Sequence, residues 1–166
     1  MSVIQTKLRG HVVVAGYGAS GAAAVSELIR RGADPASIVV IDPHGESAAA
    51  AESCGANAID GDATRNATLE AVQVAQARAI MVSAGRDDTS ILIVLTARRL
   101  ASDVPISVVI RSEDNEALAR QAGANMVINP ARIAGLLLAG SAPGPLVACG
   151  DSTASADDIP LPPGGC

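Results

Sequence analysis

Short, continuously apolar runs, separated by Ala-rich segments, restrict the fold of this chain more than any other feature. The clear runs span 11–15 (HVVVA), 37–41 (SIVVI), 79–83 (AIMVS), 106–110 (ISVVI) and 126–128 (MVI), with a weaker candidate at 57–60 (NAID). Runs without polar alternation indicate strands covered on both faces, as in a parallel sheet. We therefore expect an α/β fold: a Rossmann-like, doubly wound, six-stranded parallel sheet with helices on both faces.

The segments between the runs have helical composition and supply the crossovers that parallel strands require. Predicted helices span 20–31, 47–53, 64–73, 87–101, 115–122 and 130–139. The part 89–96 (TSILIVLT) also has strand propensity, but a crossover is needed there, and Asp87 or Asp88 is a suitable N-cap. That helix is apolar on nearly every side, which indicates a subunit interface. The apolar stripe Ile133, Leu136, Leu137 either docks on its own sheet or crosses to a neighbour.

Length and composition limit the possible classes of protein. The 166 residues fit one domain, and the 49% hydrophobic content is enough for a core. A net charge of −5 and 1% aromatic residues argue against nucleic acid as a partner. We expect a nucleotide-binding domain over 1–139 and a Pro/Gly-rich, disordered tail over 140–166. Three widely spaced cysteines and the lack of a long apolar run indicate a reducing, cytoplasmic location.

A glycine-rich loop follows the first run and precedes the first predicted helix. Its residues 16–21 (GYGASG) form a complete GxGxxG motif in the strand–loop–helix context of a dinucleotide-binding fold. Gly16 permits the tight turn, Gly18 lets the backbone approach a pyrophosphate, and Gly21 allows close helix–strand packing. The helix N-terminus then offers free N–H groups to phosphates. Tyr17, the single aromatic residue, packs on the ligand or faces solvent.

An acidic residue stands where a ribose-binding carboxylate is expected. Asp42 ends the second run, about 20 residues after the glycine motif, as in dinucleotide-binding units. A carboxylate there favours paired ribose hydroxyls and repels a 2′-phosphate, which predicts NAD-type or adenosine ligands rather than NADP. The alternative is a plain glycine turn with Asp42 as an ordinary cap.

Further motifs occur in a fixed order along the chain: 10–14 (GHVVV), 61–64 (GDAT), 83–88 (SAGRDD), 122–125 (AGAN) and 127–130 (VINP). Together with the glycine loop, this series resembles the N-terminal domain of the RCK (regulator of K⁺ conductance) family, also known as the Trk-type nucleotide-binding domain. The resemblance spans roughly residues 9–139.

The resemblance implies which residues bind the ligand. Phosphates would lie against Gly16, Gly18, Ala19, Ser20 and Gly21, the ribose against Asp42, and the adenine against Asp62 and Ala63. Ser83 and Ala84 would line the ligand. Alternatives stay open for three residues: Arg111 reaches a phosphate or is a solvated strand end, and Asp62 binds or caps a helix. His44, with Pro43 before it, flanks the adenosine or sits in a Pro–Gly turn. We favour the turn for His44.

The resemblance also implies a regulatory function. Members bind a nucleotide in the cytoplasm, dimerise or form an octameric ring, and gate potassium flux through a channel or uptake-transporter pore at the inner face of the membrane. The implied ligands are NAD or NADH, or alternatively ATP, ADP or AMP. The sequence departs from the family's fullest form, because it holds no pore segment and no second subdomain. It also has Val109, Ile110 and Arg111 where calcium-gated members carry glutamates. Glu113, Asp114 and Glu116 follow, as a metal site or as an acidic helix N-terminus.

Enzymatic activity is not expected. A dehydrogenase needs a substrate site and a proton donor besides the glycine loop. The two histidines are His11, interpreted as structural, and His44, and no Walker-type motif occurs. The alternative hypothesis is a small NAD-dependent oxidoreductase or an NAD-based redox sensor.

Overall fold

The computed structural model describes residues 8–141 and contains one six-stranded, wholly parallel sheet. The strand order is β3-β2-β1-β4-β5-β6. The strands are β1 (Val12–Ala15), β2 (Ile38–Asp42), β3 (Asn57–Asp60), β4 (Ala79–Val82), β5 (Ile106–Val109) and β6 (Met126–Ile128). This is the doubly wound Rossmann-like sheet that the apolar runs predict, and the weaker candidate at 57–60 is a strand.

Helices connect the strands and follow the last one. They are α1 (Ala19–Arg30), α2 (Gly45–Ser53), α3 (Asn66–Ala71), α4 (Asp87–Leu100), α5 (Glu113–Gln121) and α6 (Pro130–Gly140), with 3-10 turns η1 (Pro35–Ser37) and η2 (Val74–Gln76). The segment 89–96 is helical, as the need for a crossover predicted. Residues 1–7 and most of the predicted tail, from residue 142 on, lie outside the described residues.

The predicted caps differ from those in the structure. Arg86, not Asp87 or Asp88, occupies the N-cap position of α4, and both aspartates lie in its first turn. The Asp87 carboxylate accepts instead from the backbone N–H groups of Arg111 and Ser112. The helix predicted over 64–73 begins only at Asn66 and has Arg65 at its N-cap position. Asp62 is therefore not the cap of that helix.

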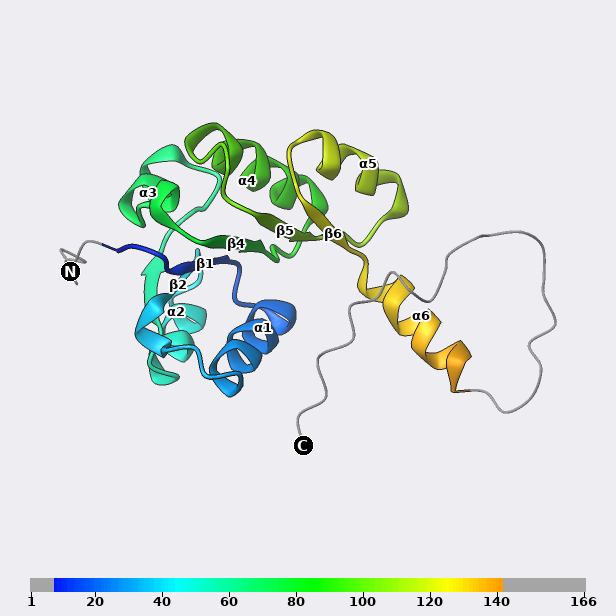
Figure 1. Ribbon diagram of the computed structural model, residues 1–166, viewed down its shortest axis with the longest axis horizontal. Helices are drawn as coiled ribbons and strands as arrows, with labels where there is room; N and C mark the ends of the chain where they lie inside the picture. The colour runs from blue at the N-terminus through cyan, green and yellow to red at the C-terminus, as the bar shows by residue number, and fades with distance from the viewer. Residues whose placement is uncertain (1–7, 142–166) are drawn as a thin grey trace.

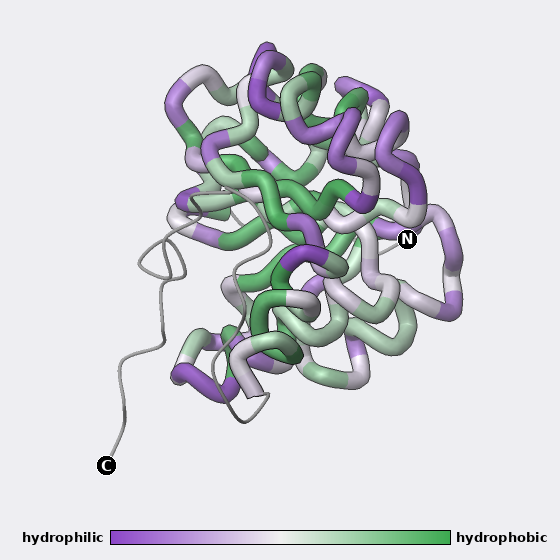
Figure 2. Tube along the Cα trace, turned by 90° about the vertical axis from the view of Figure 1, so that its right-hand side faces the viewer, coloured by the Kyte–Doolittle hydropathy of each residue, from purple (hydrophilic) through white to green (hydrophobic). Residues whose placement is uncertain are grey.

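The helices form two layers around the sheet, as Figure 1 shows with α3, α4 and α5 above it and α1 and α2 below. Alternate strand residues serve the two layers. Val13 and Ala15 belong to the larger core cluster beside α3, α4 and α5, whereas Val12 and Val14 belong to the smaller cluster beside α1 and α2. In Figure 2 hydrophobic residues concentrate along the strands and hydrophilic ones on the outer turns of the helices. Burial on both faces explains why the central strands β1 and β2 lack polar alternation.

One half of the lower sheet face has little cover. Helix α6 extends away from the two layers (Figure 1), and none of its residues 130–140 is buried. An apolar groove of about 620 Å³ therefore lies over β4, β5 and β6 between α1 and α6. Met81, Met126 and Ile128 line its floor, and Ala24 and Leu137 line its walls. We call this feature the apolar groove.

The topology places the functional edge at the carboxyl ends of the central strands. β1 pairs in parallel with β2 on one side and with β4 on the other, so the winding direction reverses between them. In open α/β sheets, ligands bind in the crevice at this switch point. Across residues 8–141, no helix combines the length and hydropathy needed to cross a membrane.

Candidate nucleotide-binding site

The glycine loop is held tightly against the sheet at two of its three glycines. Gly16 has φ +99°, and a Cβ there would lie 2.6 Å from the carbonyl oxygen of Ser83. A Cβ on Gly21 would lie 2.0 Å from the carbonyl oxygen of Gly16. The Ser83 hydroxyl donates to that Gly16 oxygen at 2.9 Å. Gly16 and Gly21 are therefore required by packing within the chain itself.

No packing contact within the described part of the chain requires a glycine at position 18. A Cβ on Gly18 would meet no atom within 4 Å, and its φ of −73° suits any residue. Gly18 is also the N-cap position of α1, and it gives no side-chain cap to the N–H groups of the first turn. That turn contains no acidic residue. The helix therefore presents uncapped amides and an uncompensated positive dipole end to the space above Gly18.

Asp42 lies at the end of β2, beside this loop, and is 6% exposed. Its Oδ2 accepts from the Tyr17 backbone N–H at 2.7 Å, and its Oδ1 accepts from the His44 backbone N–H at 2.9 Å. Burial alone would raise the pKa of Asp42. The hydrogen bonds from Tyr17 and His44 outweigh burial and hold that pKa below its ordinary value. Asp42 is thus an ionised acceptor that also positions the glycine loop.

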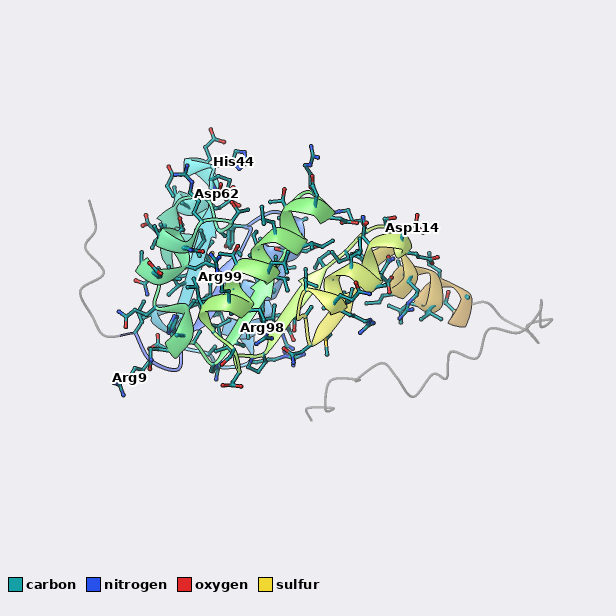
Figure 3. The ribbon with its side chains drawn as sticks, turned by 90° about the horizontal axis from the view of Figure 1, so that it is seen from above. Arg9, His44, Asp62, Arg98, Arg99 and Asp114 are labelled. Atoms are coloured by element: carbon teal, nitrogen blue, oxygen red, sulfur yellow. The ribbon has the colours of Figure 1, made fainter. Side chains whose placement is uncertain are left out.

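Two predicted residues near Asp42, His44 and Asp62, have different hydrogen-bond partners. Figure 3 shows His44 and Asp62 along one edge of the molecule, away from Arg98 and Arg9 at the opposite edge. The His44 ring is 79% exposed, with Nδ1 3.0 Å from Asp42 Oδ1, and His44 occupies the N-cap position of α2. The Asp62 carboxylate accepts from the N–H and the hydroxyl of Thr64 at 2.9 Å and 2.7 Å. These bonds lower the pKa of Asp62 and close a turn.

Tyr17 turns toward α2. Its ring is half-buried against the smaller core cluster, and its hydroxyl donates to the Cys54 thiol at 3.8 Å. Within the described residues, Cys54 is a free, exposed cysteine. The Tyr17 backbone N–H thus holds the glycine loop to Asp42, while the Tyr17 side chain packs against the smaller core cluster.

A cleft of about 120 Å³ gathers one group of the predicted residues at the carboxyl edge: Gly16, Asp42, Pro43, His44, Ala63, Ser83 and Ala84. Ala63 is buried and forms part of the apolar lining of the cleft. Sequence reasoning missed Gly85, Thr89 and Ile93, which also line the cleft. Thr89 and Ile93 are one turn apart on α4, a spacing that could have placed them on its sheet-facing side.

The other predicted residues lie around the cleft. Ser20 and Gly21 line the apolar groove on the far side of the loop. The Arg111 guanidinium donates to the Ala84 carbonyl at 3.0 Å and borders a second, shallower hollow of about 510 Å³. Arg86 and Asn115, which were not predicted, line that hollow. The cleft and the hollow share Gly85, so they adjoin along the edge.

The arrangement at the carboxyl edge offers binding groups, and of the two histidines only His44 lies there, beside Asp42. His11 is 1% exposed, and its Nε2 lies 2.8 Å from the Val72 carbonyl oxygen, so it is held in the core. Burial lowers the pKa of His11. Free amides, a carboxylate at the end of β2 and an apolar wall fit the phosphates, the ribose and the base of an adenine nucleotide.

The family model of the TrkA-N domain matches residues 12–130 of this chain. An uncharacterized protein of Methanothermus fervidus is 28% identical over an alignment of 127 residues. The alignment covers 74% of this chain and 19% of that protein. The chain thus spans about a fifth of the length of that relative.

Solved structures show the same fold. The TrkA-N domain of the inner membrane protein ybaL from Escherichia coli has a TM-score of 0.74 at 22% identity, covering 82% of this chain and all (100%) of that one. The GsuK channel bound to NAD has a TM-score of 0.71 at 28% identity, covering 80% of this chain and 23% of that one. GsuK has also been solved bound to ADP, with a TM-score of 0.70 at 28% identity, covering 80% of this chain and 34% of that one.

Proposed function

Because the chain belongs to the TrkA-N domain family, we propose that it is a cytoplasmic, nucleotide-sensing regulatory domain that controls potassium flux through a channel or an uptake transporter. One observation carries this proposal: Gly18 faces open space at an uncapped helix N-terminus, with the buried Asp42 carboxylate beside it. Nothing within the described chain requires a glycine there. A ligand that approaches the backbone closely accounts for it.

The proposed ligand is an adenine nucleotide without a 2′-phosphate. The pyrophosphate accepts from the amides of Ala19, Ser20 and Gly21, which have no side-chain cap. Asp42 accepts from the ribose hydroxyls, and its ionised state disfavours a second anion at that position. The adenine lies against Ala63 in the cleft. The GsuK structures with NAD and with ADP support both a dinucleotide and a mononucleotide.

The proposed working unit is a homodimer formed through α6. Leu136, Leu137 and Leu138 are 45%, 62% and 72% exposed, although a leucine is usually buried. The apolar groove beside them is lined mostly by apolar side chains and adjoins α6 itself. Two copies that lay their α6 helices into each other's grooves would cover both surfaces with one two-fold operation. Ligand binding would shift the arrangement of this dimer, or of a ring built from it, and so act on a membrane pore.

Titration calorimetry with NAD, NADH, ATP, ADP, AMP and NADP tests the ligand proposal. We expect measurable binding of at least one unphosphorylated nucleotide and much weaker binding of NADP. The Gly18→Val variant should lose at least tenfold in affinity, because its side chain fills the pyrophosphate space. Ala36→Val is the matched control, because Ala36 is exposed in η1, before the start of β2, and lines neither the cleft nor the apolar groove.

Unchanged affinity in Gly18→Val would contradict the proposed placement of the ligand. Turnover of NADH with candidate substrates, measured on the same protein, would instead favour the alternative oxidoreductase. Nucleotide binding without turnover, accompanied by a change in the sedimentation coefficient, would favour the proposed regulatory domain.

A further inference from the structure

We propose that the first turn of α5 couples the nucleotide cleft to the orientation of α6, with Glu116 and Asn129 as positioning residues. This inference rests on the proposed function and adds the route by which ligand binding reaches the dimer helix. Three consecutive sets of hydrogen bonds carry it: the first two join elements that are separated in sequence, and the third is the local cap of α6.

The first set joins the cleft loop to α5. Residues 83–85 line the cleft, and Asp87 begins α4 directly after them. The Asp87 carboxylate accepts from the Arg111 N–H at 3.0 Å, the Ser112 N–H at 2.9 Å and the Asn115 side-chain amide at 3.0 Å. Asp87 therefore follows the cleft loop on one side and holds the start of α5 on the other.

The second set joins α5 to the end of β6. Glu116 is the residue after Asn115, so the same helical turn carries both side chains. Glu116 Oε1 accepts from Asn129 Nδ2 at 3.0 Å. The plain interpretation of Glu116, as one of three acidic residues at a helix N-terminus, leaves this specific partner unexplained.

The third set fixes α6. Asn129 is 5% exposed, and its Oδ1 accepts from the Ala131 and Arg132 N–H groups at 3.1 Å and 3.2 Å, which caps the helix. Both ends of the Asn129 amide are therefore engaged, one by α5 and one by α6. None of the residues 130–140 is buried, and within the described residues this N-cap supplies the side-chain hydrogen bonds that hold the start of α6.

A small movement at the cap is magnified along the helix. Eleven residues of α6 extend about 16 Å, so a tilt at Asn129 displaces the leucines of the last turns by several times the shift at the cap. A nucleotide that moves the loop 83–86 would displace Asp87, then the α5 turn, then the α6 leucines that enter the partner's groove. Since binding linkage is reciprocal, dimerisation should alter nucleotide affinity equally.

The test uses two variants that interrupt the proposed route and one control variant, all in the full chain. Glu116→Ala removes the nearer acceptor of Asn129 Nδ2, leaving only the Arg111 carbonyl oxygen at 3.5 Å, and keeps the α6 cap. Asp87→Ala removes all three bonds from the start of α4 to the start of α5. Glu116→Gln keeps an acceptor at the same place. The dimer dissociation constant is measured by analytical ultracentrifugation with and without NAD, and NAD affinity by calorimetry. Melting curves check that each variant is folded.

In the wild type we expect NAD to shift the dimer dissociation constant by about fivefold or more. Glu116→Ala and Asp87→Ala should reduce that shift to less than twofold, with NAD affinity of the monomer within twofold of wild type, and Glu116→Gln should retain the shift. A full shift in both interrupting variants would overturn the coupling route. NAD binding without any shift in the wild type would overturn the route and leave nucleotide binding intact, whereas failure of the wild type to bind any adenine nucleotide would overturn the proposed function itself.

Discussion

Single residues at the carboxyl edge serve the fold and the proposed ligand to different degrees. Gly16 and Gly21 are required by their own chain, because a Cβ at either would meet backbone atoms. Asp42 has two functions, since its carboxylate holds the Tyr17 amide and also lies where a ribose is expected. The sequence spacing predicted that Asp42 and the glycine loop act together, and the structure places them side by side. The hydrogen bond from Tyr17 to Asp42 could not be foreseen, because it depends on the detailed conformation of the loop.

Replacing Asp42 should change which nucleotide binds. Asp42→Asn removes the charge that repels a 2′-phosphate and replaces one acceptor oxygen by a donor. We expect NAD to bind about tenfold more weakly, corresponding to about 1.4 kcal/mol, and the preference for NAD over NADP to shrink. Calorimetry with both nucleotides measures this.

Asp103→Asn is the matched control, because Asp103 is exposed and lies in the loop before β5, at the opposite edge of the sheet. A variant at Asp42 that kept both the affinity and the preference of the wild type would contradict the role of its carboxylate.

At the level of elements, every predicted strand and helix that falls in residues 8–141 is present, with ends within two residues. Apolar runs and the need for crossovers were sufficient, since the central strands β1 and β2 are buried on both faces, whereas the partly exposed edge strand β3 was the weaker prediction. The helix ends were less predictable, because tertiary hydrogen bonds decide them. Asp87 had the right residue type for a cap, but the amides of the β5–α5 loop are its partners.

The C-terminal end of α4 depends on Arg98 in a comparable way. The Arg98 guanidinium donates to the carbonyl oxygens of Ala101, Ser102, Val104 and Gly123 and to Asn125 Oδ1. Arg98→Met keeps the apolar stem but leaves these acceptors without their donor. We expect a loss of about 2–4 kcal/mol in the free energy of unfolding, measured by urea titration.

Arg99→Met serves as the control for Arg98→Met. Arg99 is exposed and contacts only the Asn66 side chain among the hydrogen bonds of the described residues, so we expect a change below about 0.5 kcal/mol. Equal losses in the two variants would show that Arg98 has no special structural role.

For the whole molecule, the uneven cover of the sheet is the main finding that sequence reasoning did not provide. The stripe Ile133, Leu136, Leu137 left two possibilities open, docking on the chain's own sheet or crossing to a neighbour. In the structure Ile133 and Leu137 line the edge of the apolar groove and Leu136 does not, but both leucines remain exposed. Periodicity gives the apolar face of a helix, but not the direction in which the helix leaves the sheet.

A charge in the groove-lining face of α6 should separate the proposed dimer. Leu137 is 62% exposed, so Leu137→Asp should leave the monomer folded while raising the dimer dissociation constant at least tenfold. Sedimentation over a range of concentrations measures this. Ala131→Asp is the control, because Ala131 is exposed on the first turn and does not line the groove. A mass in solution that is the same for both variants and the wild type would contradict dimerisation through α6.

The poorly covered half of the sheet also affects the stability of the newly synthesised monomer. Met126 is 48% exposed on the edge strand β6, and it lines the apolar groove together with the exposed Leu137. Contiguous apolar surface of this kind promotes unspecific sticking between chains. The melting temperature should therefore rise with protein concentration, as mass action requires when folding and dimerisation are linked. A cell that makes little of this chain would hold mainly the monomer, which is the less stable form.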